Sequence, residues 1–317
     1  MSTSAFPEPV AAAVPAPLPY HRLALARARR TWWQPLLTGV LALAFYAAMI
    51  AILFIGLMIV AFEVPAVDRV VESMLVTDAW FDLDQPGLFV LLVVPLILMI
   101  PALLAASRIV QGRGVGMLWS VAGRIRWSLL GRTLVVAFVI MAAFFAASLG
   151  LDALRGEPIV FEATHPGIPA MLILVVLLVP FQAAAEEYVF RGYLMQLIGR
   201  WLRHPAFAIL LPVPLFVLGH GYDIWGSLDI AAFAIIAGWL SWRTGGLEAA
   251  IAMHIANNVL IFVMASFSLV DGNATEGTPI GLVSSVIMML VYVAIVARRG
   301  GAERPQAASR SSASRIV

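Results

Sequence analysis

The 317-residue chain contains no cysteine, which excludes disulfide bonds, thiolate metal ligands and a cysteine nucleophile. Only 12% of its residues are charged, whereas a soluble domain carries about 25%. Hydrophobic residues make up 62% of the chain, and its mean hydropathy is +0.96. This composition excludes an ordinary soluble protein and indicates an integral membrane protein. No polar stretch is long enough to fold alone, so we expect one membrane domain rather than two soluble ones.

Long apolar runs dominate the chain after a start that is rich in Ala and Pro. A bilayer needs about 20 apolar residues per helix, and the run over 36–62 exceeds the roughly 7–15 residues of a signal-peptide core. We predict an all-α, polytopic transmembrane helix bundle, because lipid does not satisfy exposed backbone groups and the runs lack the alternation of barrel strands. About eight spans are expected, of which the fifth and sixth are short: 36–62, 88–107, 133–152, 168–190, 206–220, 228–242, 246–268 and 280–297.

The predicted organisation has three parts. Residues 1–34 form a disordered basic tail, residues 35–298 form the transmembrane bundle, and residues 299–317 form a second disordered tail. Within the bundle, residues 168–268 hold the polar motifs described below, and the polar cavity lies in this second half.

Arginines alternate with acidic residues from one loop to the next. The loop over 108–132 carries five arginines and no acid, and arginines also follow the fourth, sixth and eighth spans. The loop after the first span and the region of Asp223 and Asp229 are acidic instead. Because loops rich in Lys and Arg stay in the cytoplasm, we expect a multi-pass protein of the cytoplasmic (inner) membrane with both termini cytoplasmic. Leu118 and Trp119 further predict that 108–132 forms a helix lying on the membrane surface.

Three of the later spans carry polar residues that are costly in lipid. They are Gln182, Glu186, Glu187 and Arg191 in the fourth span, His220 at the end of the fifth, and His254, Asn257 and Asn258 in the seventh. A charge at the bilayer centre costs about 2.5–3.5 kcal/mol on insertion scales, so such residues usually line a cavity and carry function. Of the five histidines, only His220 and His254 fall in or at the end of an apolar span.

Helical spacing predicts which of these side chains share a face. Three pairs are spaced i,i+4: Glu187 and Arg191, Phe216 and His220, and His254 and Asn258. Glu187 precedes Arg191, which is the favourable order for an ion pair. Glu186 is rotated by about 100° from Glu187, because 3.6 residues make one turn, so it need not share that pairing.

An unpaired carboxylate, two imidazoles and an amide are sufficient to activate water. A carboxylate in a desolvated cavity can take a proton from water, and a histidine can share that water or polarise a carbonyl. A His–Asn pair can donate hydrogen bonds to a developing oxyanion. Structural roles stay open for individual residues: an ion pair for Glu187 and Arg191, a helix–helix hydrogen bond for Asn257, and a cavity wall for Phe216.

The motif segments resemble those of the CPBP family, which comprises CAAX proteases and bacteriocin-processing (Abi) proteins. The family's motifs EExxxR, FxxxH and HxxxN stand here, in the same order, as Glu186-Glu187-x-x-x-Arg191, Phe216-x-x-x-His220 and His254-x-x-x-Asn258. The Arg-Thr-Gly-Gly-Leu turn at 243–247 is also similar to that family's turn. The resemblance covers roughly residues 168–268 and implies a glutamate-dependent intramembrane endopeptidase.

The resemblance also implies a role for each motif residue. Glu186 would be the general base for water, assisted by His220, and His254 with Asn258 would form the oxyanion site. Glu187 and Arg191 would support them.

Metal dependence stays open, and the cofactor is either none or one Zn²⁺. Members of the family are often named metalloproteases. By chemistry alone, His220, His254 and Glu186 are suitable ligands for Zn²⁺ with an open fourth position. Against this stands the absence of HExxH, the usual zinc signature on one helix.

Convergence of these residues requires an irregular fifth span. At a rise of 1.5 Å per residue, His254 lies roughly 12 Å below the cytoplasmic edge, whereas His220 lies roughly 20 Å deep if that span starts at Pro205. We therefore expect the span to start outside the lipid, to tilt, or to be interrupted near Pro212 and Pro214. The cavity is expected to open towards the cytoplasm.

Two other function classes remain open. A non-proteolytic immunity or scaffold protein of the same fold would use the polar cavity for recognition only. A proton-coupled transporter would show an inverted repeat, whereas the polar residues here lie almost wholly in the second half. The expected partners are the lipid bilayer and a membrane-associated peptide or protein substrate, without nucleic acid. The Arg- and Ala-rich composition suggests a bacterial protein, for which bacteriocin leaders, peptide pheromones or membrane-protein tails are more natural substrates than prenylated proteins.

Overall fold

The computed structural model describes residues 18–26, 31–77, 79–112 and 114–300. For residues 299 and 300 it describes the backbone only. The described part is all α, apart from one isolated β-bridge between Ser120 and Gly246. The predicted fold class is therefore confirmed. Most of the two predicted disordered tails lies outside the described residues.

Seven helices in the described part are long and apolar enough to cross a membrane when interrupted helices are counted once. They are α1 (Gln34–Glu63), α3 and α4 (Pro86–Ile97 and Met99–Gln111), α5 (Trp127–Leu154), α6 with η3 and α7 (Ile168–Glu187, Tyr188–Leu194 and Met195–Trp201), α10 (Ile224–Thr244), α11 (Glu248–Ser266) and α12 (Pro279–Gly300). Their outer faces expose large apolar side chains, such as Val40 at 65% and Ile52 at 71%. A water-exposed apolar surface of this extent would be unstable, so the chain is a multi-pass membrane protein.

Seven long spans are found among the described residues where about eight were predicted, and the difference lies at the fifth segment. The segment expected over 206–220 consists of two short helices, α8 (Pro205–Leu210) and α9 (Val213–Leu218), which together are too short to span. Pro212 and Pro214 interrupt the helix here, because a proline lacks the N–H and its ring clashes with the carbonyl four residues earlier. The expected interruption near these prolines is thus confirmed. The sixth predicted span, in contrast, is the unbroken helix α10.

The prediction of a disordered tail over 1–34 is wrong for Tyr20–Ala26, which form the 3-10 helix η1. Tyr20 is only 1% exposed, and its hydroxyl donates to the Leu118 carbonyl at 2.5 Å. The η1 helix packs against α7 at the basic end of the bundle. Burial of an aromatic and of Leu23 gives this short segment a fixed position that its Ala- and Pro-rich neighbours did not suggest.

The surface helix predicted over 108–132 is also wrong. Helix α4 extends to Gln111, the short 3-10 helix η2 covers Val115–Leu118, and α5 begins at Trp127. Gly112 ends α4, Gly114 directly precedes η2, and Gly123 lies in the turn that follows it; all three have positive φ, which only glycine adopts at no steric cost. Residues 115–126, which we call the clasp segment, fold inwards instead, and Leu118 and Ser120 are buried.

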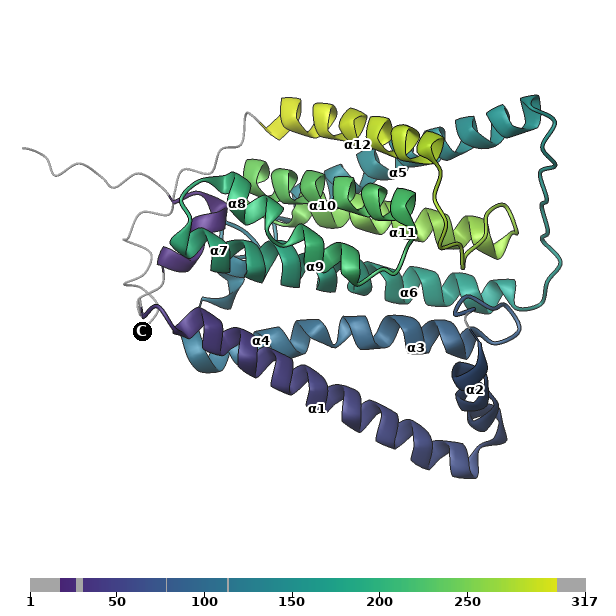
Figure 1. Ribbon diagram of the computed structural model, residues 1–317, viewed down its shortest axis with the longest axis horizontal. Coiled ribbons are helices and arrows are strands. Elements are labelled where there is room, and N and C mark those ends of the chain that lie inside the picture. Colours follow the sequence, from purple (N-terminus) through teal and green to yellow (C-terminus); the bar gives the residue numbers. More distant parts are fainter. Residues whose placement is uncertain (1–17, 27–30, 78, 113, 301–317) are drawn as a thin grey trace, which may run out of the picture.

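Helix α11 is the buried centre of the bundle. It packs against α5, α6 and α10, and Figure 1 shows it running between α6 on one side and α5 on the other. Ala249, Ala250, Ala252 and Ala256 are fully buried on this helix. Small side chains let neighbouring backbones approach closely in a membrane bundle, so the alanines allow α11 to be surrounded by helices.

The remaining loops lie at two opposite ends of the bundle (Figure 1). The clasp segment, η1, the α7–α8 turn and the α10–α11 turn lie at one end, on the left in the view, where the arginine-bearing loops meet. The 12-residue helix α2 (Pro65–Val76) and the loops before α6 and after α11 lie at the other end. The predicted alternation of basic and acidic loops thus corresponds to two separate ends of the structure.

Candidate active site

The candidate site begins where α6 changes its helix type. Glu186 and Glu187 are the last residues of α6, and the chain continues without a break into η3, a π-helix. Short π-helical segments within α-helices are frequent at functional sites. Across this change, Arg191 Nη1 still donates to Glu187 Oε1 at 2.8 Å, with both side chains buried. The predicted ion pair between Glu187 and Arg191 is therefore confirmed.

His254, on α11, faces both glutamates. Its Nδ1 lies 3.0 Å from Glu187 Oε1, and its Nε2 lies 3.7 Å from Glu186 Oε2. A carboxylate can only accept hydrogen bonds, so the Nδ1 that contacts Glu187 carries a hydrogen. Glu187 thus fixes the orientation of the imidazole ring and leaves Nε2 directed at Glu186.

A chain of carboxamides connects Glu186 to the end of the third motif. Gln182 Nε2 donates to Glu186 Oε1 at 2.7 Å, and Asn258 Nδ2 donates to Gln182 Oε1 at 3.1 Å. Asn257 Nδ2 in turn donates to Asn258 Oδ1 at 3.1 Å. Gln182 is therefore part of the site, although it was not among the predicted site residues. The signal for it was present, since a glutamine in an apolar span lies i,i+4 from Glu186.

Two phenylalanine rings surround the charged groups. The Arg191 guanidinium lies 4.4 Å from the centroid of the Phe216 ring, a distance typical of a cation–π contact. The Phe233 ring, from α10, meets the His254 ring edge to face at 5.0 Å. Phe216 is therefore more than a wall, because it contacts the arginine of the first motif. Nothing in the spacing of the sequence pointed to Phe233.

His220 reaches the network only through Phe216. Its Nδ1 lies 2.7 Å from the Phe216 carbonyl, and its ring lies 4.7 Å from the Phe216 ring. Within the described part of the chain, no hydrogen bond, ion pair or ring contact joins His220 to Glu186 or His254. The structure thus brings Glu186, His254 and Asn258 into one network and places His220 beside it.

The charges of the buried network balance only with one additional proton. Glu186 and Glu187 contribute two negative charges and Arg191 contributes one positive charge, all at buried side chains. Unbalanced buried charge is strongly unfavourable. One oxygen of each glutamate has no hydrogen-bond partner in the structure. Glu186 Oε2 is such an atom, and it is the one that faces His254.

The arrangement of the residues does not fit the zinc site that the sequence left open. Across the described residues, no group of three His, Cys, Asp or Glu side chains is placed to hold a metal ion. His220 is separated from the other two predicted ligands, and the Glu187 oxygen nearest His254 is also bonded to Arg191. We therefore derive no step through a metal.

Comparisons with known proteins agree with the motifs. Residues 166–260 match the family model described as type II CAAX prenyl endopeptidase Rce1-like. This segment contains the first, second and third motifs, so the resemblance drawn from them is confirmed. The uncharacterised protein YyaK of Bacillus subtilis (strain 168) is 29% identical to the chain over 123 residues. That match covers 34% of this chain and 41% of YyaK, so the chain spans less than half of that relative. No solved structure matches the chain.

Proposed function

We propose that this chain, which carries the Rce1-like signature over residues 166–260, is an intramembrane endopeptidase. It would hydrolyse a peptide bond of a membrane-associated protein or peptide in the cytoplasmic membrane. The arginine-bearing end of the bundle, with both termini, would face the cytoplasm.

The observation that carries this proposal is the buried pair of Glu186 and His254. Glu186 Oε2 and His254 Nε2 lie 3.7 Å apart, and the carboxylate oxygen has no hydrogen-bond partner among the described residues. Hydrogen bonds between oxygen or nitrogen atoms are about 2.7–3.0 Å long, so one water molecule can contact both atoms from a position beside the line that joins them. A water held in this way faces a base and an imidazole at once.

In the proposed reaction, Glu186 takes a proton from this water while the water oxygen attacks the scissile carbonyl carbon. The new carbon–oxygen bond turns the carbonyl into a tetrahedral oxyanion. Glu186 then gives the proton to the leaving nitrogen, and the carbon–nitrogen bond breaks. The products are an amine and a carboxylic acid, which releases its own proton.

His254 and Asn258 would stabilise the oxyanion. When its ring carries a hydrogen on both nitrogens, His254 can donate from Nε2 while Glu187 holds its Nδ1. Asn258 Nδ2 donates one hydrogen to Gln182 and keeps a second for the substrate. Donors arranged before the reaction in a dry site are worth several kcal/mol each.

His220 would assist from the turn that follows α9. Its Nδ1 is held by the Phe216 carbonyl, so Nε2 is the atom that is available to a bound substrate. A small open pocket, lined by Arg191 and Phe216 among others, borders this region. A substrate segment that enters from this side would pass close to both motif residues.

The substrate would be a peptide segment that reaches the buried network from the membrane. The family description names CAAX prenyl endopeptidases, so a protein with a lipid-modified C-terminus is one candidate. Unmodified membrane peptides, such as secreted-peptide leaders, are the other.

The test compares cleaved membrane peptides in cells that carry the wild type, Glu186→Gln or His254→Ala. We expect peptides that are present with the wild type and missing with both variants. Asp152→Asn is the control, because it changes an exposed ion pair with Arg155 at one end of α5. Identical peptide profiles in all four strains would refute the peptidase and favour the immunity or scaffold function. If the profiles differ, addition of a chelator to the purified protein then tests metal dependence.

A further inference from the structure

The clasp segment (115–126) is bonded to the helix that carries the two glutamates. The Trp119 ring lies 4.9 Å from the ring of Tyr188, the residue that follows Glu187. Gln196 Nε2, on α7, donates to the Met117 carbonyl at 2.8 Å. The clasp therefore has a fixed position relative to α6 and η3.

The same segment is bonded to the turn that begins α11. The Val121 N–H donates to the Gly245 carbonyl at 2.8 Å, and the Leu247 N–H donates to the Trp119 carbonyl at 2.9 Å. Gly245 has a φ of +73° and ends α10. The clasp is thus a bridge between the two helices whose side chains meet in the candidate site.

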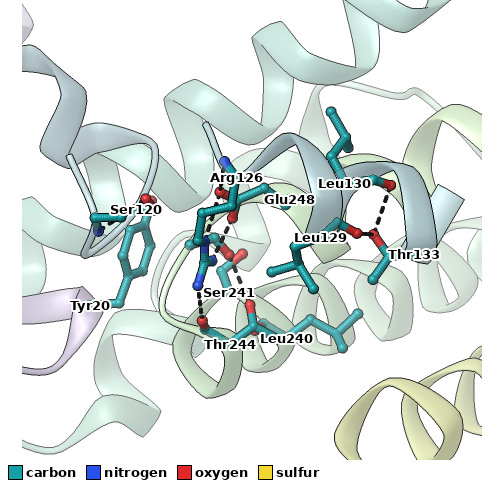
Figure 2. A network of polar contacts seen from close by, with 12 residues as sticks. Tyr20, Ser120, Arg126, Leu129, Leu130, Thr133, Leu240, Ser241, Thr244 and Glu248 are labelled. Carbon is teal, nitrogen blue, oxygen red and sulfur yellow. Dashed lines mark hydrogen bonds and ion pairs between the residues drawn. The ribbon is translucent and has the colours of Figure 1, made fainter. Parts of the chain in front are cut away.

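A partly buried ion pair closes this bridge (Figure 2). Glu248 is 1% exposed, and its Oε1 accepts from the Arg126 backbone N–H at 2.9 Å and from Arg126 Nε at 3.0 Å. Its Oε2 accepts from Arg126 Nη2 at 2.6 Å, and Arg126 Nη1 donates to the Thr244 carbonyl at 2.9 Å. Figure 2 shows the guanidinium between Glu248 and Thr244, with Ser120 of the clasp segment and Tyr20 of η1 to the left of it. A bidentate pair of this kind fixes the relative orientation of the two side chains as well as the distance between them.

The two residues of the pair stand at the starts of two helices. Glu248 is the first residue of α11, where a carboxylate interacts favourably with the helix dipole. Arg126 is the residue directly before α5, which packs along α11. His254 follows Glu248 by six residues, or about 9 Å along a helix that rises 1.5 Å per residue. A shift at the start of α11 is therefore passed on to His254.

We propose that Arg126 and Glu248 are positioning residues that hold His254 opposite Glu186 and Glu187. This inference rests on the proposed peptidase function for its effect on rate. Buried ion pairs stabilise little compared with apolar replacements of the same size, so stability alone does not account for this one. Misplacement of a reacting group by about 1 Å costs about a hundredfold in rate, so an error in the position of α11 affects turnover directly.

The test uses Glu248→Gln and Arg126→Lys in the purified protein. Glu248→Gln keeps one acceptor for the Arg126 backbone N–H, but its amide places a donor against the guanidinium. Arg126→Lys keeps the positive charge but loses the guanidinium that binds Glu248 through two nitrogens. This variant therefore decides the test if Glu248→Gln fails to fold. Asp152→Asn, which breaks the exposed pair with Arg155, is the matched control for a lost carboxylate charge.

Two measurements are made on each variant. With a peptide substrate, we expect kcat to fall by about tenfold to a hundredfold while KM changes little, and the control to behave as the wild type. In ¹⁵N-histidine spectra, assigned with His254→Gln, we expect the ring nitrogen signals of His254 to move in both clasp variants and not in the control. Unmoved His254 signals, or an unchanged kcat, would overturn the positioning role. If His254 moves but the wild type cleaves no peptide, the positioning stands and the proposed function fails.

Discussion

The carboxylate of Glu187 and the imidazole of His254 lie 3.0 Å apart, although 67 residues separate them in the chain. The same carboxylate oxygen also accepts from Arg191 at 2.8 Å. One buried oxygen thus ties α6 and η3 to α11 and sets the ring orientation of a histidine. The first-motif ion pair and the third-motif histidine are therefore parts of one unit. Glu187 both pairs with Arg191 and orients the His254 ring.

Replacement of Glu187 is expected to destabilise the protein strongly. Glu187→Ala leaves the buried Arg191 guanidinium without its partner, and loss of one member of a buried ion pair costs about 3–5 kcal/mol. Glu187→Gln keeps an acceptor for His254 and is expected to cost less. Thermal unfolding of the purified protein in detergent measures both. Asp152→Asn is the control, and its exposed pair is worth at most about 1 kcal/mol. Equal unfolding temperatures for Glu187→Ala and the control would contradict the role of this contact.

Phe216 is expected to matter through its contact with Arg191. Phe216→Leu removes the ring that lies 4.4 Å from the guanidinium, and a desolvated cation–π contact is worth about 2 kcal/mol. The neighbouring Phe190 is the matched control, because its ring lies 6.0 Å from the same guanidinium. We expect Phe216→Leu to lower both stability and peptide cleavage more than Phe190→Leu does. Comparable losses in the two variants would show that only apolar volume matters at these positions.

Gly246 is expected to tolerate no side chain. A Cβ at this position would lie 2.5 Å from both Arg126 Nη2 and Glu248 Oε2 and 2.6 Å from Ser120 Cβ. Gly246→Ala would therefore push the clasp segment away from α11, at a cost of about 1–3 kcal/mol for overpacking. At Gly150, on α5, a Cβ meets nothing within 4 Å, so Gly150→Ala is expected to be neutral or stabilising by up to about 1 kcal/mol. Differential scanning fluorimetry on the two variants checks the difference, and a Gly246→Ala protein as stable as the wild type would contradict the tight approach.

The η1 helix is expected to loosen as the pH falls. Burial lowers the pKa of His21 below its ordinary value of 6.5, and the charges of Arg22 and His204 act in the same direction, against the hydrogen bond with the Arg203 carbonyl. A lowered pKa means that folding favours the neutral ring. The contribution of His21 is therefore fully present above about pH 6.5 and is lost as the pH falls towards the lowered value.

Hydrogen exchange of residues 20–26, corrected for the intrinsic pH dependence, measures this loosening. We expect protection to decrease between about pH 7 and pH 5, where an unperturbed histidine gains its charge. His21→Asn removes the titrating group and should make protection independent of pH in this range. A wild type whose η1 protection does not change with pH would refute the assignment to His21.

Several features of the site were predictable because they depend on neighbours within one helix. The Glu187–Arg191 pair follows from i,i+4 spacing alone, and the interruption of the fifth span follows from Pro212 and Pro214. Gln182 was visible in the same way, as a polar residue one turn before Glu186. The place of His220 was not predictable, because the direction of α9 after the proline break depends on its packing against α10.

The sequence by itself determined the membrane class, the helical fold and the polar motifs that the later spans carry. These depend on composition, on runs of apolar residues and on spacing along single helices, which are local properties. Only the tertiary structure decided that His254 contacts both glutamates, that Arg126 and Glu248 close the clasp, and that Tyr20 belongs to the core. Each of these contacts joins residues that are tens to more than a hundred positions apart. No local pattern encodes them, because the packing of whole helices sets the distance between their side chains.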